Sequence, residues 1–256
     1  MITVTILTKN CEETLPATLD SLKDFPEVIV YDTGSTDKTP EIAARYANVK
    51  WIQGTFDGFG PTHNQASARA TYDWILSIDS DEVLTPELSK ELLSRKLDPR
   101  SIYCLNRHNF FNGKWIRGCA GWYPDPVRRL YNRKETLFSD DEVHEKVILR
   151  PGMQEIPLSP PLLHTPYRSL SDFLPKMQHY STLFAKQYQG KKSSSLFKAI
   201  AHAAAAFTKS YFFKRGILAG KEGFIISAYY GHTAFYKYLK LAEANKAKAC
   251  SPHERS

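Results

Sequence analysis

The sequence lacks the features that would mark a disulfide-rich, metal-cluster or membrane-spanning protein. Its 256 residues contain four cysteines, and none of these forms a C-x-x-C pair or shares a regular spacing. A zinc or disulfide framework is therefore not expected, and a reducing cytoplasm is the favoured compartment. No apolar run approaches the ~20 residues of a membrane-spanning helix. The N-terminus begins directly on a strand-like segment, so no signal peptide is expected.

Acidic residues are scarce in the last third of the chain. Residues 176–256 contain 14 Lys and Arg against 3 Asp and Glu, whereas residues 1–175 contain 20 against 24. The net charge of +7 is thus −4 in the first part and +11 in the second. This split predicts a basic appendage that meets an anionic partner. Nucleic acid is not expected as that partner, because no nucleic-acid-binding motif accompanies the charge.

The first hundred residues alternate between strand-like and helix-like segments. Apolar and β-branched runs predict strands over residues 2–8, 28–31, 49–52 and 74–78. Helical spacing and capping residues predict helices over residues 12–22, 40–46, 62–70 and 86–95. This alternation is typical of βαβ units, so we expect an α/β fold with a mostly parallel sheet. Right-handed crossovers would gather the loops that follow the strands at one edge, where ligands bind in such folds.

Two carboxylates follow the fourth predicted strand. Asp79 and Asp81 come directly after the apolar run 74–78. A pair of carboxylates one residue apart can hold a single hard cation such as Mg²⁺ or Mn²⁺. D-x-D is also common in solvated turns, but the strand before it favours a metal site. Asp79 to Val83 additionally resembles the D-x-D-x-[TV] signature of haloacid-dehalogenase-type phosphatases, in which Asp79 would be a nucleophile, although two βα units precede it here.

The motifs, in this order, resemble those of family 2 glycosyltransferases, which have the GT-A fold. The resemblance rests on the T-K-N at residues 8–10, the D-T-G-S-T-D at 32–37 and the W-I-L-S-I-D-S-D-E at 74–82. The G-W-Y-P-D-P-V-R-R-L-Y at 121–131 and the V-H-E at 143–145 are similar to a narrower branch, the β-1,4-glucosyltransferases of the lipopolysaccharide inner core. We therefore expect a Rossmann-like GT-A nucleotide-sugar domain over residues 1–166 and a basic helical extension over 167–256.

The resemblance implies an inverting enzyme that moves a hexose, with glucose expected, from a UDP-sugar to a heptose of the lipopolysaccharide core. The transfer would be a single, metal-dependent displacement. Another exopolysaccharide, capsule or lipid acceptor stays open within the class. From other classes, the alternatives are a phosphatase and a non-catalytic basic membrane-binding protein. The expected location is the inner face of the cytoplasmic membrane, with the protein peripherally bound, and a homodimer stays open.

The resemblance also implies roles for individual residues. The expected donor-binding residues are Thr8, Lys9, Asn10, Asp32, Asn64, Asp79 and Ser80, with Arg69 as a weaker candidate. The expected metal ligands are Asp79, Asp81 and His144. The base that an inverting enzyme needs is expected at Glu145, with Asp141 and Glu142 as second choices. Asp32 could instead cap a turn, Lys9 and Asn10 could cap the first helix, and His144 could be a structural histidine.

The last third of the chain predicts amphipathic helices. Aromatic and apolar residues recur at helical spacing over residues 173–188, 196–211 and 224–239, with basic residues beside them. Such stripes can pack on the catalytic domain or in a dimer. They also suit a helix that lies on an anionic leaflet.

Overall fold

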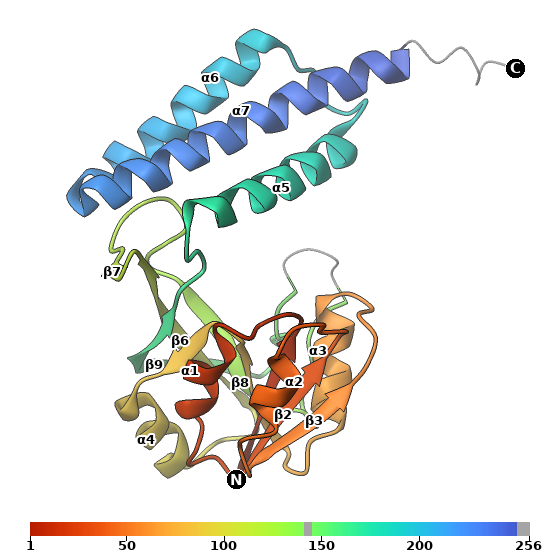
Figure 1. Cartoon of the computed structure of the whole chain (residues 1–256), viewed down its shortest axis with the longest axis vertical. Helices are drawn as coiled ribbons and strands as arrows, with labels where there is room; N and C mark the ends of the chain where they lie inside the picture. The colour runs from red at the N-terminus through yellow and green to blue at the C-terminus, as the bar shows by residue number, and fades with distance from the viewer. Residues whose placement is uncertain (141–144, 250–256) are drawn as a thin grey trace, which may run out of the picture. The chain divides into compact units, whose positions relative to one another are not determined.

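A computed structural model describes residues 1–140 and 145–249 (Figure 1). The chain forms two compact units. Unit 1 contains residues 1–108 and 124–164, and unit 2 contains residues 109–123 together with the chain from residue 165 onward. The functional division at residue 166 stays a prediction, and the structure adds the segment 109–123 to the helical unit.

Unit 1 is built on one mixed sheet. The four neighbouring strands β3, β2, β1 and β4 pair in parallel. On the other side of β4, the pairs β4–β8, β8–β6 and β9–β5 are antiparallel. In spatial order the strands are β3 (Val49–Gln53), β2 (Glu27–Asp32), β1 (Ile2–Thr8), β4 (Trp74–Asp79), β8 (Pro126–Asn132), β6 (Ser101–Phe111), β9 (Gln154–His164) and β5 (Glu82–Leu84). The α/β class is confirmed. β9 covers a proline-rich stretch that the sequence analysis left without a strand.

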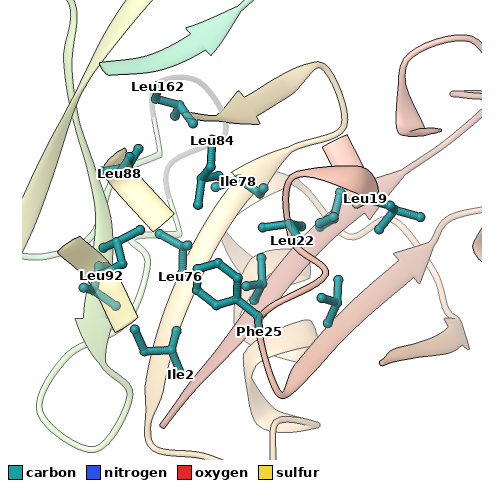
Figure 2. Packing of buried hydrophobic residues seen from close by; sticks show 14 of the residues in the cluster. Ile2, Leu19, Leu22, Phe25, Leu76, Ile78, Leu84, Leu88, Leu92 and Leu162 are labelled. Atoms are coloured by element: carbon teal, nitrogen blue, oxygen red, sulfur yellow. The ribbon is translucent and has the colours of Figure 1, made fainter. Parts of the chain in front are cut away.

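Helices cover both faces of the parallel half of the sheet. Strand side chains alternate between the faces, so Ile78 and its neighbour Leu76 point to one side while Ile75 points to the other. The first side packs against leucines of α1 (Leu15–Asp20) and α4 (Pro86–Ser94), as Figure 2 shows, and against α2 (Thr39–Ala43). The second side packs against α3 (Phe59–Ala68). These two cores hold the parallel strands rigidly in register.

The strand order reverses between β1 and β4, which places a crevice at their carboxyl ends. β2 and β3 lie on one side of β1, while β4 lies on the other. In the ladder, Thr8 pairs with Asp32 and Leu7 pairs with Asp79. The loops after β1, β2 and β4 therefore begin side by side at one sheet edge, as the alternation of strands and helices predicted.

Glu27 ties the opposite edge of the parallel sheet together. Its carboxylate is 4% exposed and accepts hydrogen bonds from Thr3 Oγ1 (2.5 Å), Thr71 N (2.8 Å) and Thr71 Oγ1 (2.6 Å). It also forms an ion pair with Lys50. Burial opposes its ionisation, but Lys50 and the hydroxyl donors outweigh burial and lower the pKa of Glu27 to about 2.

We expect Glu27→Ala to lower the free energy of unfolding by about 3 kcal/mol at neutral pH, because the buried Thr3 hydroxyl, two donors of Thr71 and the Lys50 ammonium lose their acceptor. The folded-state pKa lies below the ordinary value of 4.5. The contribution of the charge is therefore present above that value and lost as the pH falls toward about 2. Urea unfolding across this range measures the effect. The exposed Glu135→Ala is the control, and an equal loss in both variants would contradict the role of Glu27.

Unit 2 is a helical unit in which α7 lies between α5 and α6. Its helices are α5 (Phe173–Tyr188), α6 (Leu196–Thr208) and α7 (Lys221–Ala249), with short 3-10 helices at Leu170–Asp172 and Gly216–Ala219 and a π-helical turn at Lys209–Phe213. Tyr238 of α7 stacks on His202 of α6, with ring centroids 3.8 Å apart, and contacts Phe184 of α5. The hairpin of β6 and β7 (Lys114–Trp115) completes this unit and contributes Phe111 to its core.

The connection from α6 to α7 is more than a simple helix end. α6 ends at Thr208, the π-helical turn follows, and Arg215 adopts a left-handed conformation with φ 57°. Gly223 allows the next turn to close, because a Cβ there would lie 1.8 Å from the carbonyl oxygen of Gly216. Within the described residues, none of the helices has an apolar stretch that is long enough to span a bilayer.

Candidate functional site

The loops after β1 and β2 are locked to each other by Asp32. Its carboxylate is 1% exposed and accepts four hydrogen bonds, from Gly34 N (3.0 Å), Ser35 N (2.9 Å), Ser35 Oγ (2.5 Å) and Thr8 Oγ1 (3.2 Å). Asn10, with φ 54°, accepts from Thr36 N through its side chain (2.8 Å). Asp32 thus has the turn-capping role that the sequence left open for it, and Thr8 is one of its donors. Their contact with a nucleoside stays a prediction.

Asp79 leaves the end of β4 and meets two buried charges. Its Oδ2 lies 2.5 Å from Nη2 of Arg129, and the same nitrogen lies 2.8 Å from Oε1 of Glu82. Glu82 is fully buried and also accepts from Asp79 N (2.8 Å) through Oε2. Burial opposes charge on Asp79, but Arg129 outweighs it and lowers the pKa of Asp79. Asp79 is therefore a carboxylate at neutral pH whose orientation is set by Arg129 and Glu82.

Arg107 of β6 extends this network. Its Nη1 lies 3.2 Å from Glu82 Oε1 and 3.8 Å from Asp79 Oδ2, and its Nε donates to Asp125 Oδ2 at 2.9 Å. Two guanidinium groups and three carboxylates thus lie together at the end of β4. The two arginines and Glu82 were not among the expected site residues.

Asp81, two residues beyond Asp79, pairs with a different residue. Its Oδ2 lies 3.6 Å from Nε2 of His164, at the end of β9, and both side chains are partly exposed. The Asp81 carboxylate suits Mg²⁺ or Mn²⁺ when water and phosphate oxygens complete the coordination, and an imidazole nitrogen suits the transition ion Mn²⁺ better than Mg²⁺. Among the described residues no three His, Cys, Asp or Glu side chains form a metal-binding group. Within the described part of the chain, the coordination of a cation at this pair would be completed by a ligand such as a diphosphate.

Other expected donor-binding residues have local partners. Ser80 donates to the sulfur of Cys11 (3.0 Å), and its carbonyl accepts from Thr18 Oγ1 (2.9 Å), which fixes the D-x-D turn on the first helix. Lys9 is exposed at the edge beside this turn. Arg69 is exposed after α3, in the link that enters the amino end of β4, so the expectation that it lines the donor cleft is wrong.

Asn64 is hydrogen-bonded to Phe138, which directly precedes the acidic run at residues 139–145. Its side-chain amide donates to the carbonyl of Phe138 (3.0 Å) and accepts from Phe138 N (2.9 Å). Phe138 pairs with Val147, and Ser139 N donates to Lys146 O (2.9 Å). Glu145 is half-buried next to this bridge. The other residues expected in this loop, Asp141, Glu142 and His144, lie outside the described residues.

The sequence contains weak signals for Arg129 and His164, which the sequence analysis did not assign to the site. Arg129 directly precedes the apolar Leu130 and Tyr131 in β8, where an unpaired charge would be costly, so a buried partner was implied. His164 ends an apolar run, as Asp79 does on β4.

His63 of α3 is also buried beneath the site, and its Nδ1 lies 3.1 Å from Ser77 Oγ. Burial lowers the pKa of His63 to about 4. His63 is therefore neutral at physiological pH.

The chain is similar to known proteins in sequence and in fold. Residues 3–155 match the family model described as glycosyl transferase family 2. An uncharacterized glycosyltransferase of Rickettsia typhi is 29% identical over 94% of this chain and 87% of its own. The lipopolysaccharide core biosynthesis glycosyltransferase LpsC of Rhizobium meliloti is 26% identical over 95% and 93%. A mannosyltransferase of Pyrobaculum calidifontis, solved with GDP-Man and Mn²⁺, has a TM-score of 0.47 at 17% identity, covering 99% and 76%.

The family match and the sheet topology confirm the GT-A fold and the glycosyltransferase class predicted from the motifs. The phosphatase and the non-catalytic alternatives are thereby removed as the main function of unit 1.

Proposed function

Because the chain belongs to glycosyl transferase family 2, we propose that it transfers a hexose from a UDP-sugar to a lipid-linked oligosaccharide with inversion. Glucose is the expected sugar and a heptose of the lipopolysaccharide core the expected acceptor. The observation that carries the proposal is the convergence of Asp79, Asp81 and His164 with two arginines at the switch point between β1 and β4. The name of the relative LpsC supports the choice of acceptor.

Asp81 and His164 are the residues that would hold a divalent cation. Such a cation neutralises the charge that grows on a departing diphosphate. Asp79 is held by Arg129 and therefore has a fixed position. We assign it to orienting the donor beside the cation. A site with rigid, pre-oriented charges stabilises a transition state without reorganising during the reaction.

Arg107 and Arg129 set the charge balance of the site. The carboxylates of Asp79, Glu82 and Asp125 compensate both guanidinium groups, so neither arginine is left free to attract the diphosphate by itself. A cation held by Asp81 would then supply positive charge for the diphosphate, next to the exposed Lys9. This is the physical reason to propose a cation-dependent rather than an arginine-based enzyme.

The donor and acceptor can be tested together. Release of the nucleoside diphosphate is measured with UDP-glucose, UDP-galactose, UDP-N-acetylglucosamine and GDP-mannose, each with Mg²⁺, Mn²⁺ or a chelator. A core oligosaccharide ending in heptose is present or absent. We expect release from UDP-glucose that needs the cation and increases with the heptose acceptor. Activity with GDP-mannose alone, or activity that the chelator leaves unchanged, would contradict the proposal.

Glu145 is our proposed base. We expect Glu145→Gln to leave donor affinity unchanged and to lower turnover about 10²-fold or more, because general-base catalysis is lost. Turnover and donor affinity are measured separately by product formation and by titration calorimetry with UDP. Glu135→Gln, on the exposed side of the preceding turn, serves as the control. If Asp141→Asn or Glu142→Gln has this effect instead, the base is that residue; if none of the three does, the acidic loop is not catalytic.

A further inference from the structure

Helix α6 of unit 2 is apolar on the side that faces solvent. It packs on α7 through small residues: Ala199 is buried, and Gly231 of α7 lies so close that a Cβ would meet the carbonyl of Ala203 at 3.3 Å. Opposite this contact, Phe197, Ala201 and Ala204 recur at helical spacing, and all are exposed. An apolar helix surface that faces solvent is typical of a site that binds another protein or a membrane.

The same surface continues into the turn that joins α6 to α7. Its large apolar side chains are exposed to a degree that is unusual for phenylalanine and leucine: Phe197 is 80% exposed, Phe213 79% and Leu218 77%. We call this set the α6 apolar surface. It consists of Leu196, Phe197, Ile200, Phe212, Phe213, Ile217, Leu218 and Phe224.

In the stretch of the chain from Asp172 to Glu222, which contains α6, all charged side chains between these two acidic residues are basic. Nine Lys and Arg, and no Asp or Glu, occur between Asp172 and Glu222. Lys198 lies on α6, and Lys209, Lys214 and Arg215 lie in the connection that follows it, all exposed. A second copy of the chain on this surface would bring these positive charges together, because a twofold contact pairs a patch with itself. An anionic partner fits instead.

A basic hollow adjoins Leu218. It has a volume of about 390 Å³ and is lined by Lys114, Trp115, Arg117, Gly118, Arg215, Leu218 and Ala219. The guanidinium of Arg117 lies 4.0 Å from the ring centroid of Trp115. Lys114 donates to the carbonyl of Ala219 (2.8 Å) and is 3.9 Å from Glu222, so Arg117 and Arg215 are the cations that the hollow offers. Guanidinium groups bind phosphate oxygens through paired hydrogen bonds.

We propose that the α6 apolar surface and the adjoining basic hollow dock unit 2 on an anionic phospholipid leaflet. Phe197, Phe212, Phe213 and Leu218 enter the boundary between headgroups and acyl chains, and Arg117 and Arg215 bind lipid phosphates. Apolar side chains ringed by basic ones are the pattern of reversible interfacial binding. The proposal concerns unit 2 alone and does not depend on the sugar-transfer reaction.

The test is co-sedimentation of the full chain with vesicles. One set contains phosphatidylcholine alone and the other contains equal amounts of phosphatidylcholine and phosphatidylglycerol. We expect binding to the anionic set that decreases as salt increases. Phe213→Ser with Leu218→Ser should weaken this binding about tenfold or more, because two exposed side chains lose their burial in lipid. Leu93→Ser, an exposed leucine of α4, is the matched apolar control and should bind normally.

The charge requirement is tested in the same assay. Lys209→Glu with Lys214→Glu should also weaken binding about tenfold or more, whereas Lys90→Glu with Lys96→Glu in unit 1 should have little effect. Release of UDP from the donor without acceptor should be unchanged in all four variants, which separates this proposal from the proposed function.

Three outcomes would overturn the docking proposal. The first is equal binding to neutral and anionic vesicles, or to neither. The second is a Phe213→Ser, Leu218→Ser variant that binds lipid normally but loses self-association in sedimentation velocity, which would make the surface a dimer contact. The third is lipid binding that depends on the lysines alone and is displaced by duplex nucleic acid, which would make it a general polyanion site.

Discussion

Replacing Asp81 by asparagine is expected to lower turnover about 10³-fold and to leave the free energy of unfolding almost unchanged. The side chain is partly exposed at the switch-point edge, and its Oδ2 lies 3.6 Å from Nε2 of His164. No core contact is therefore lost. Asparagine keeps the shape but removes the charge that a divalent cation needs. Turnover is measured by UDP release, and stability by urea unfolding.

The control is Asp24→Asn, an exposed carboxylate outside the site, which should have normal turnover. Higher Mn²⁺ concentrations should restore part of the activity of Asp81→Asn, since the affinity for the cation is what the substitution lowers. Asp79→Asn should also abolish transfer, because it releases Arg129. A near-normal rate in either variant would show that the D-x-D carboxylates do not form the site.

Arg129→Ala is expected to have the largest effect on stability, a loss of about 3–5 kcal/mol in the free energy of unfolding. The substitution leaves Glu82, which is fully buried, without its 2.8 Å partner. The substitution also removes the guanidinium group that pairs with Asp79. Arg107 still pairs with Glu82 at 3.2 Å, so the loss should lie toward the lower end of the range.

A double variant separates the buried charge from the shape of the side chain. Arg129→Met with Glu82→Gln removes both charges and keeps the volume, so it should recover part of the stability lost in Arg129→Ala. It should not recover activity, because Asp79 is no longer oriented. The control Arg95→Ala breaks a surface pair with Glu91 and should cost about 1 kcal/mol or less. A loss of that size in Arg129→Ala would contradict the role of the network.

The parallel half of the fold could be read from the sequence because its signals are local. Each strand from β1 to β4 is an apolar run bounded by turn residues. Among α1 to α4, α4 also has a side-chain cap: Thr85 accepts from Leu88 N, with Pro86 next to it. The position of Asp79 and Asp81 after β4 follows from the same local pattern. The loop that begins at Asp32 was recognised because its motif is contiguous.

The sequence by itself thus determined the fold class, the strand-end carboxylates and the basic, aromatic character of the last third of the chain. Only the tertiary structure decided which residues meet. Arg129, Glu82 and Arg107 form one network, and His164 reaches Asp81, although β4, β6, β8 and β9 are far apart in the chain. Periodicity carries no information about antiparallel pairing at such separations. The solvent-facing side of α6 was likewise hidden, because an apolar stripe looks the same whether a neighbour covers it or not.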